Sequence, residues 1–325
     1  MRRSLSTLFT LLFLAACTPH IEGLGEKIRV ADLVDDHYIA EDGVKLPLRI
    51  WEPVEAPKAI LIGVHGFNDY GNFLTPGMET YLQQNAIKLI TYDQRGFGAA
   101  PHRGLWAGTE ALTHDLASII HLVHARHEKL PLYVIGESMG GAVVMTTLAK
   151  IKPLPVTGAI LSAPAVWGPS TWPWYQKASL YAVSYTMPWL KLSGGGIVQP
   201  TDHIENWKNW SLDPLVIRGT RVDGLWGISW LMQDALDHTS DLKVPTLVLY
   251  GQKDELIPMG PTGQMISALD DKHKVAFYPD GWHWLPRDKN GPVVWKDVVS
   301  WIGDPDKGLP SGADVGAREK IIQHP

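Results

Sequence analysis

One serine stands between glycines at the point where one apolar run ends and another begins. Residues 132–137 are rich in Val, Ile and Tyr, and the stretch "GESMG" (136–140) leads into a second apolar segment. A G-x-S-x-G pattern is typical of a sharp strand-to-helix turn that exposes the serine hydroxyl and points helix N–H groups toward it. The pattern therefore predicts that Ser138 is a nucleophile. The alternative is an ordinary serine in a glycine-rich turn.

A serine hydroxyl needs a base to take its proton, and the base needs an acid to orient it. In this motif the acid follows the serine and a histidine follows the acid. We prefer His283, because "YPDGWHWLP" comes just after the last predicted strand. The alternative for His283 is a loop histidine that packs between two tryptophans. The other histidines lie in or beside an insertion or open a strand: His203, His238 and His273.

The acid is expected in "LVLYGQKDELIP", where a strand ends and exposes two carboxylates. Asp254 comes first and is the preferred residue, and Glu255 and Asp280 are the alternatives. Two backbone donors must also stabilise the developing oxyanion. We expect them to be the N–H of Met139, directly after the serine, and the N–H of Phe67, after the run "ILIGVHG".

These side chains require an alternating set of strands and helices. Apolar runs predict strands, and amphipathic stretches predict helices between them. This alternation predicts an α/β fold, with a mostly parallel sheet that helices cover on both faces. A hairpin precedes it at 37–53. The predicted strands are 58–66, 87–93, 130–137, 156–164, 244–251 and 273–279, and the predicted helices are 76–85, 109–129, 259–269 and 291–302.

The alternation lapses between residues 165 and 240, which hold eight of the fourteen tryptophans. We interpret this segment as a helical lid over the crevice at the carboxyl ends of the strands. It would form an apolar slot, or its tryptophans would form the lid's own small core. The core domain is then 35–164 and 241–302. Residues 303–325 have few large apolar side chains and are expected to form a flexible tail.

The N-terminus has the pattern of an export signal. Two arginines precede a short apolar run that ends in L-A-A-C, and Cys17 is the only cysteine. Residues 1–17 therefore predict a lipoprotein signal peptide with a lipobox, and 18–34 predict a tether. The acylated Cys17 would anchor the chain to a membrane surface on the periplasmic side, and Thr18 favours the outer membrane. An ordinary signal peptide with a chance cysteine is the alternative.

Composition narrows the classes of partner. The chain of 325 residues has 45% hydrophobic and 19% charged residues and a net charge of −5, so it lacks the basic footprint of a nucleic-acid-binding protein. A hydrolytic serine asks for no metal or organic cofactor. Four histidines on the predicted helix 109–129 are interpreted as a solvated face rather than metal ligands: His114, His121, His124 and His127.

Four stretches together resemble the α/β-hydrolases of the monoacylglycerol lipase, lysophospholipase and serine aminopeptidase group: "VHGFNDYG", "YDQRGFGAAPHRG", "GESMGGA" and "GQKDELIP…GWHW". The resemblance covers roughly residues 36–302. It implies the fold above, and it implies that Asp93 and Arg95 brace the loops behind the site. Two departures stand out: many relatives have His where this chain has Glu137, and Asn68-Asp69 replaces a frequent Gly-Glu-His.

The leading hypothesis is hydrolysis of a carboxylic ester with one fatty chain, such as a monoacylglycerol or a lysophospholipid. The alternatives are a small-ester carboxylesterase and a serine aminopeptidase, in which a carboxylate would bind the substrate amine. Asp202, Glu205 and Asp223 are the candidates for that carboxylate. A lipid-binding lipoprotein with an inactive hydrolase fold is the non-enzymatic alternative. His65, which precedes the serine, is an alternative base.

Overall fold

A nine-stranded sheet forms the centre of the computed structural model, which describes residues 18–193 and 198–323. Its first strands pair antiparallel, up to the contact of β3 with β5, and every later pair is parallel. The prediction of a mostly parallel sheet is therefore confirmed. In spatial order the strands are β1 (Asp32–Val34), β2 (His37–Ile39), β3 (Lys45–Trp51), β5 (Ile87–Tyr92), β4 (Ala59–Val64), β6 (Leu132–Glu137), β7 (Gly158–Ser162), β10 (Thr246–Gly251) and β11 (Lys274–Tyr278).

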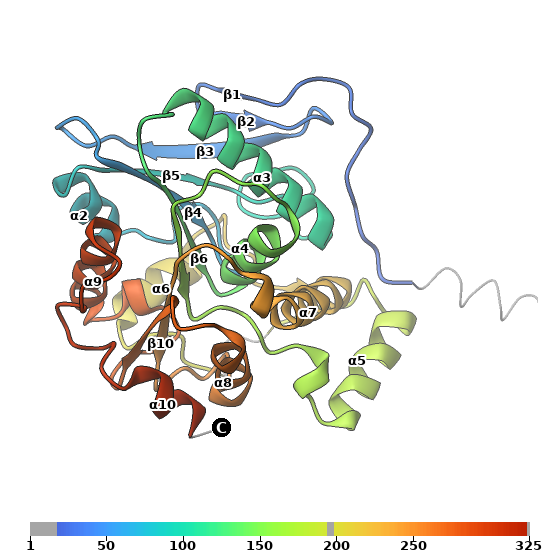
Figure 1. Cartoon of the computed structure of the whole chain (residues 1–325). Helices are drawn as coiled ribbons and strands as arrows, with labels where there is room; N and C mark the ends of the chain where they lie inside the picture. The colour runs from blue at the N-terminus through green and yellow to red at the C-terminus, as the bar shows by residue number, and fades with distance from the viewer. Residues whose placement is uncertain (1–17, 194–197, 324–325) are drawn as a thin grey trace, which may run out of the picture.

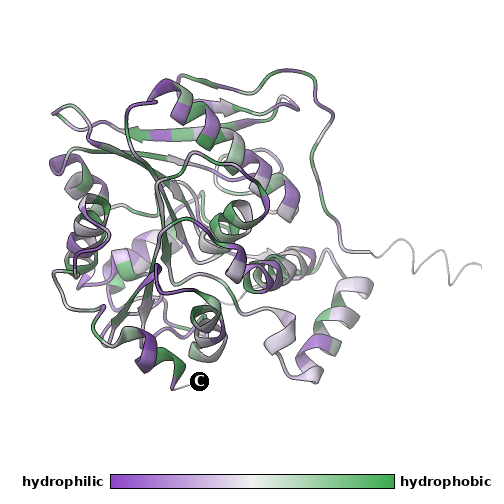
Figure 2. Cartoon of the chain, in the orientation of Figure 1, coloured by the Kyte–Doolittle hydropathy of each residue, from purple (hydrophilic) through white to green (hydrophobic). Residues whose placement is uncertain are grey.

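Helices cover both faces of the sheet, as the apolar strands require (Figure 1). Every residue of β4, β5, β6, β7 and β10 is buried, and these strands are mostly apolar in Figure 2. One core cluster includes side chains of α3 (Thr109–Arg126), α4 (Met139–Lys150), α7 (Val222–Asp237), α8 (Met259–Ala268) and α10 (Ala317–Ile322). The other includes α2 (Met78–Gln84) and α9 (Gly291–Gly303).

The predicted lid segment divides into two parts with different environments. Its first part holds α5 (Trp174–Thr186), which projects from the body of the molecule in Figure 1, and α6 (Ile204–Leu212). Its second part is α7, whose Leu231 and Ala235 are buried in the core cluster of the sheet. The second half of the insertion is thus part of the domain core. The glycines at 194–196 lie outside the described residues.

Residues 18–34 and 303–323 are more ordered than the sequence indicated. The predicted tether includes β1, and the N–H of Glu22 donates to the Trp106 carbonyl at 3.0 Å. The prediction of a flexible tail was wrong, because α10 buries Ala317 and Ile321 against the core. Arg318 on the same helix donates to four carbonyls at the end of α8 and beyond. A few apolar side chains at helical spacing suffice when such hydrogen bonds accompany them.

The predicted signal peptide, Cys17 included, lies outside the described residues. Among the residues that are described, no helix is both long and apolar enough to cross a membrane.

Candidate active site

Ser138 lies in the strained turn that its sequence pattern predicts. It joins β6 to α4 with φ 54° and ψ −118°, a region that residues with a side chain rarely adopt. Its N–H donates to the Ser162 carbonyl at 2.9 Å, which fixes the turn to β7. Neighbouring glycines permit the close contacts: a Cβ at Gly136 would lie 2.4 Å from the Gly140 carbonyl oxygen, and one at Gly140 would lie 2.0 Å from that of Val64.

The structure brings Asp254 and His283 together at the carboxyl edge of the sheet. His283 Nδ1 and Asp254 Oδ2 are 2.7 Å apart, and the two side chains are 1% and 0% exposed. The second oxygen of Asp254 accepts the N–H groups of Leu256 and Ile257 at 2.8 and 2.9 Å. Burial lowers the pKa of His283, but the charge and hydrogen bond of Asp254 more than offset this, so the pKa lies above its usual value.

The loop after β4 packs against the nucleophile turn. A Cβ on Gly66 would lie 3.4 Å from the Cβ of Ser138. Phe67 is the next residue, so the loop that carries its N–H starts beside the serine. Met139 is the first residue of α4. No helical turn precedes it, so its N–H has no acceptor within the helix and can donate to a substrate oxygen. Within the described residues no hydrogen bond joins the Ser138 hydroxyl to His283. Such bonds are often long before substrate binds.

The alternative acids and bases have other partners. Asp280 forms an ion pair with Lys253 at 2.8 Å on the surface, and Glu255 accepts the N–H of Gln199. His65 is buried, and its Nε2 accepts the N–H of Gln94 at 3.0 Å. This places His65 in the support of the loop rather than at the nucleophile.

The remaining histidines also have local partners. His203 caps α6 by accepting from Asn206, while His238 and His273 lie within 3.3 Å of an aspartate three residues away.

The expected brace behind the site is a pair of buried ion clusters. Asp93 pairs with Arg49 and accepts the N–H groups of Gly71 and Ala99, both at 2.8 Å. Arg95 binds Asp115 at 2.6 Å and Asp42 at 2.7 Å.

Sequence reasoning missed Arg287, which is buried and contacts Glu137, the residue directly before Ser138. The only signal for it was a charged residue in the apolar stretch "WHWLPRD".

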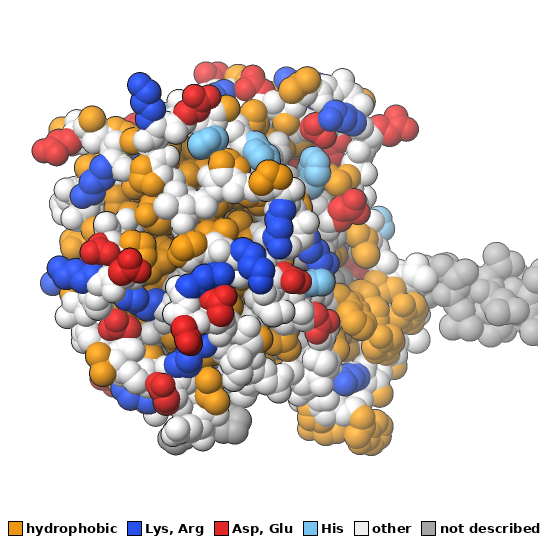
Figure 3. All heavy atoms as spheres, in the orientation of Figure 1, with side chains coloured by type: hydrophobic (Ala, Val, Ile, Leu, Met, Phe, Trp, Pro, Cys, Tyr) orange, Lys and Arg blue, Asp and Glu red, His pale blue; other side chains and the backbone are white. Residues whose placement is uncertain are grey.

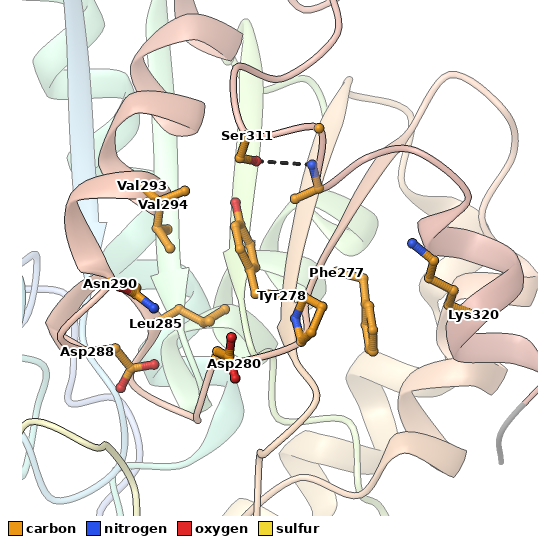
Figure 4. Close-up of a pocket in the computed structure, with 14 residues that line it drawn as sticks. Phe277, Tyr278, Asp280, Leu285, Asp288, Asn290, Val293, Val294, Ser311 and Lys320 are labelled. Atoms are coloured by element: carbon orange, nitrogen blue, oxygen red, sulfur yellow. Dashed lines mark hydrogen bonds between the residues drawn. The ribbon is translucent and has the colours of Figure 1, made fainter.

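Two of the cavities formed by the described residues are relevant to the question of a substrate site. The larger, of about 420 Å³, is drawn in Figure 4 between the end of β11, α9 and the C-terminal segment, where Tyr278 and Leu285 line it. Its lining includes neither Ser138 nor His283, so it lies outside the candidate site. The smaller one lies against Phe67 and Trp106 and has about 10 Å³, room for about one water. The expected acyl slot stays a prediction, because this space would have to open to admit a fatty chain.

The fold and the site geometry define the class of protein. A mostly parallel sheet with a strained serine after an inner strand, β6, and a buried acid–histidine pair after its last two strands, is the α/β-hydrolase architecture. Residues 55–290 match the model of the serine aminopeptidase, S33 family, so the chain belongs to that family.

Relatives at the sequence level include two lipases. A monoacylglycerol lipase of Mycolicibacterium smegmatis is 26% identical over 80% of this chain and 93% of its own length. The monoglyceride lipase of Homo sapiens is 25% identical over 82% of this chain and 89% of its own length. Among solved structures, a monoglyceride lipase variant from Saccharomyces cerevisiae with a substrate analog superposes with a TM-score of 0.69 at 18% identity, covering 88% of this chain and 97% of that one.

Proposed function

We propose that this protein is a serine hydrolase that cleaves carboxylic esters through an acyl-enzyme, and that its substrates are single-acyl lipids such as monoacylglycerols or lysophospholipids. The observation that carries the proposal is the fully buried Asp254–His283 pair at the sheet edge where the strained Ser138 is presented. The similarity to monoacylglycerol lipases over most of the chain supports the choice of substrate.

In the proposed reaction Ser138 Oγ attacks the ester carbonyl while His283 takes its proton. The N–H groups of Met139 and Phe67 stabilise the oxyanion, and Asp254 stabilises the imidazolium at Nδ1. His283 then protonates the leaving alcohol, which leaves an acyl group on Ser138. A water activated by His283 releases the fatty acid. No step requires a metal or an organic cofactor.

An aminopeptidase would need an uncommitted carboxylate to bind the substrate's amine, and two of the three candidates already have other partners. Asp223 is buried and already paired through both oxygens with Arg221. Asp202 accepts the N–H of Lys289. Glu205 is exposed on α6 and is the one candidate without a hydrogen-bond or ion-pair partner among the described residues, so Glu205→Gln tests this alternative. The aminopeptidase alternative is therefore the less supported one.

A fluorophosphonate probe tests the nucleophile directly. We expect labelling of the full-length chain, loss of labelling in Ser138→Ala, and retention in Ser162→Ala, which changes a buried serine at the end of the neighbouring strand. Hydrolysis of monoacylglycerols and p-nitrophenyl esters from C2 to C18 then tests the substrate. An absence of labelling would favour the lipid-binding alternative, and a preference for C2 and C4 would favour a small-ester carboxylesterase.

We further propose that Cys17 is acylated and holds the protein to the periplasmic face of a membrane, where fatty esters concentrate. The exposed aromatic residues on α5 support a lipid environment: Trp174 is 79% exposed and Tyr175 55%, and hydrophobic side chains gather over this helix in Figure 3. Cys17→Ser should abolish incorporation of a labelled fatty acid and release the protein from membranes, whereas Thr18→Ala should not. Continued acylation of Cys17→Ser would contradict this proposal.

A further inference from the structure

Two carboxylates beside the candidate nucleophile and the Phe67 loop contact one buried arginine. Arg287 Nη1 donates to Asp69 Oδ2 at 2.8 Å, and Nη2 donates to Glu137 Oε1. The three side chains are 5%, 6% and 1% exposed. Asp69 and Glu137 therefore belong to one buried ion cluster centred on Arg287.

Each member of this cluster belongs to a different segment of the candidate site. Asp69 lies two residues after Phe67, and Glu137 directly precedes Ser138. Arg287 ends the short helix η3 (Leu285–Arg287), four residues after His283. The guanidinium therefore connects the segments that hold the proposed oxyanion donor, nucleophile and base.

The segment around Arg287 is held from several sides. The guanidinium lies 4.0 Å from the centre of a Trp284 ring, and the backbone N–H of Arg287 donates to the Trp284 carbonyl at 2.7 Å. The Arg287 carbonyl accepts from Asn206 on α6 at 3.1 Å. Through these contacts the guanidinium is coupled to the residue directly after His283.

A buried ion cluster of this kind is a poor way to increase stability, because desolvating the charges offsets much of their attraction. Its advantage is geometry: the planar guanidinium fixes the directions of its hydrogen bonds, which a lysine ammonium does not. We propose that Arg287 is a positioning residue, which holds the Ser138 turn, the Phe67 loop and the His283 loop in register by binding Glu137 and Asp69. This inference rests on the proposed function.

The cluster also contributes to the charge around the histidine. Asp254, Glu137 and Arg287 are the charged groups that act on His283, and the two carboxylates raise its pKa while the guanidinium lowers it. Burial raises the pKa of Glu137 to about 7, an effect that Arg287 opposes and Asp69 reinforces. A neutral residue at position 137 should therefore let His283 lose its proton at lower pH.

The test compares Arg287→Lys and Glu137→Gln with Arg318→Lys, a half-buried arginine on α10 that binds carbonyls away from the site. We measure kcat/KM against pH on p-nitrophenyl butyrate, and unfolding in urea. Arg287→Lys should lower kcat/KM by about 10²-fold, the cost of a misplacement near 1 Å. Glu137→Gln should move the acid limb of the profile to lower pH. Arg318→Lys should change only the unfolding curve.

A second readout separates this inference from the proposed function. The imidazole N–H of His283 that Asp254 binds should give a downfield proton NMR signal that is absent in His283→Gln. Its titration should shift to lower pH in Glu137→Gln whether or not any ester is cleaved. A shifted signal in a protein that hydrolyses no ester would refute the proposed function and would still support the coupling of position 137 to His283.

The positioning role is wrong if Arg287→Lys keeps kcat/KM within about threefold of the parent and Glu137→Gln changes neither the profile nor the NMR titration. It is also wrong if Arg287→Lys and Arg318→Lys lose activity equally with unchanged pH profiles. Glu137→Gln preserves side-chain shape, so it decides the question if Arg287→Lys does not fold.

Discussion

Replacing Gly140 by alanine tests whether the nucleophile turn depends on backbone contact. An added Cβ would lie 2.0 Å from the carbonyl oxygen of Val64 and 2.7 Å from that of His65. Both atoms belong to the backbone at the end of β4, so no side chain can rotate away. Ordinary contact begins near 3.4 Å, and the N-terminus of α4 or the end of β4 must then move by about 1.4 Å (3.4 − 2.0).

Two consequences of this movement have different magnitudes. Overpacking in a buried site costs about 1–3 kcal/mol of the free energy of unfolding. A displacement of about 1 Å at the reacting groups lowers the rate by about 10²-fold. We therefore expect Gly140→Ala to fold with reduced stability and to lose about 10²-fold in kcat/KM.

The assay combines p-nitrophenyl butyrate hydrolysis with urea unfolding. The control is Gly303→Ala at the end of α9, where an added Cβ meets nothing within 4 Å. An alanine there should leave kcat/KM unchanged and should stabilise by at most about 1 kcal/mol. Parental kcat/KM in Gly140→Ala would refute the reasoning.

Three further predictions follow from buried groups. Asp254→Asn should lower kcat by about 10³–10⁴-fold, because the imidazolium of His283 loses its charged partner. Circular dichroism should show that the fold is retained. A loss in kcat below about tenfold would argue against this role of Asp254. Glu137 has a pKa of about 7 in the folded state, raised by burial from the ordinary value of 4.5, so the free energy of unfolding should fall as pH rises through this window, by up to about 3 kcal/mol. In Glu137→Gln the difference between urea unfolding at pH 5 and pH 8 should shrink, and an unchanged difference would contradict the assignment. Ile321→Ala should lower the free energy of unfolding by about 2–4 kcal/mol, because it removes a buried side chain of α10. Val315→Ala changes an exposed side chain and should lower it by less than about 0.5 kcal/mol. Equal effects of the two substitutions would mean that α10 does not pack as described.

The parts of the molecule that the sequence could predict depend on local pattern. Continuous apolar runs that end at a glycine identified β4, β6 and β10. The turn at Ser138 follows from the glycines on either side of it. Asp254 and His283 were expected together because parallel strands end at one edge of a sheet.

The parts that could not be predicted depend on long-range contacts. Arg287 meets Asp69 218 residues away and Glu137 150 residues away, and no local pattern encodes such a meeting. The order of the C-terminal segment likewise depends on acceptors that α8 offers to Arg318. The small number of apolar residues in 303–325 therefore led to the wrong prediction of a flexible tail.

That C-terminal segment has a consequence for association between molecules. β11 is the last strand of the sheet, and the N–H of Phe277 on its outer side donates to the Ala313 carbonyl at 2.9 Å. The segment thereby occupies part of a strand edge that could otherwise pair with another chain. A protein shortened to end near residue 302 would expose this edge, and we expect it to self-associate through added strands even if its hydrolytic groups were intact.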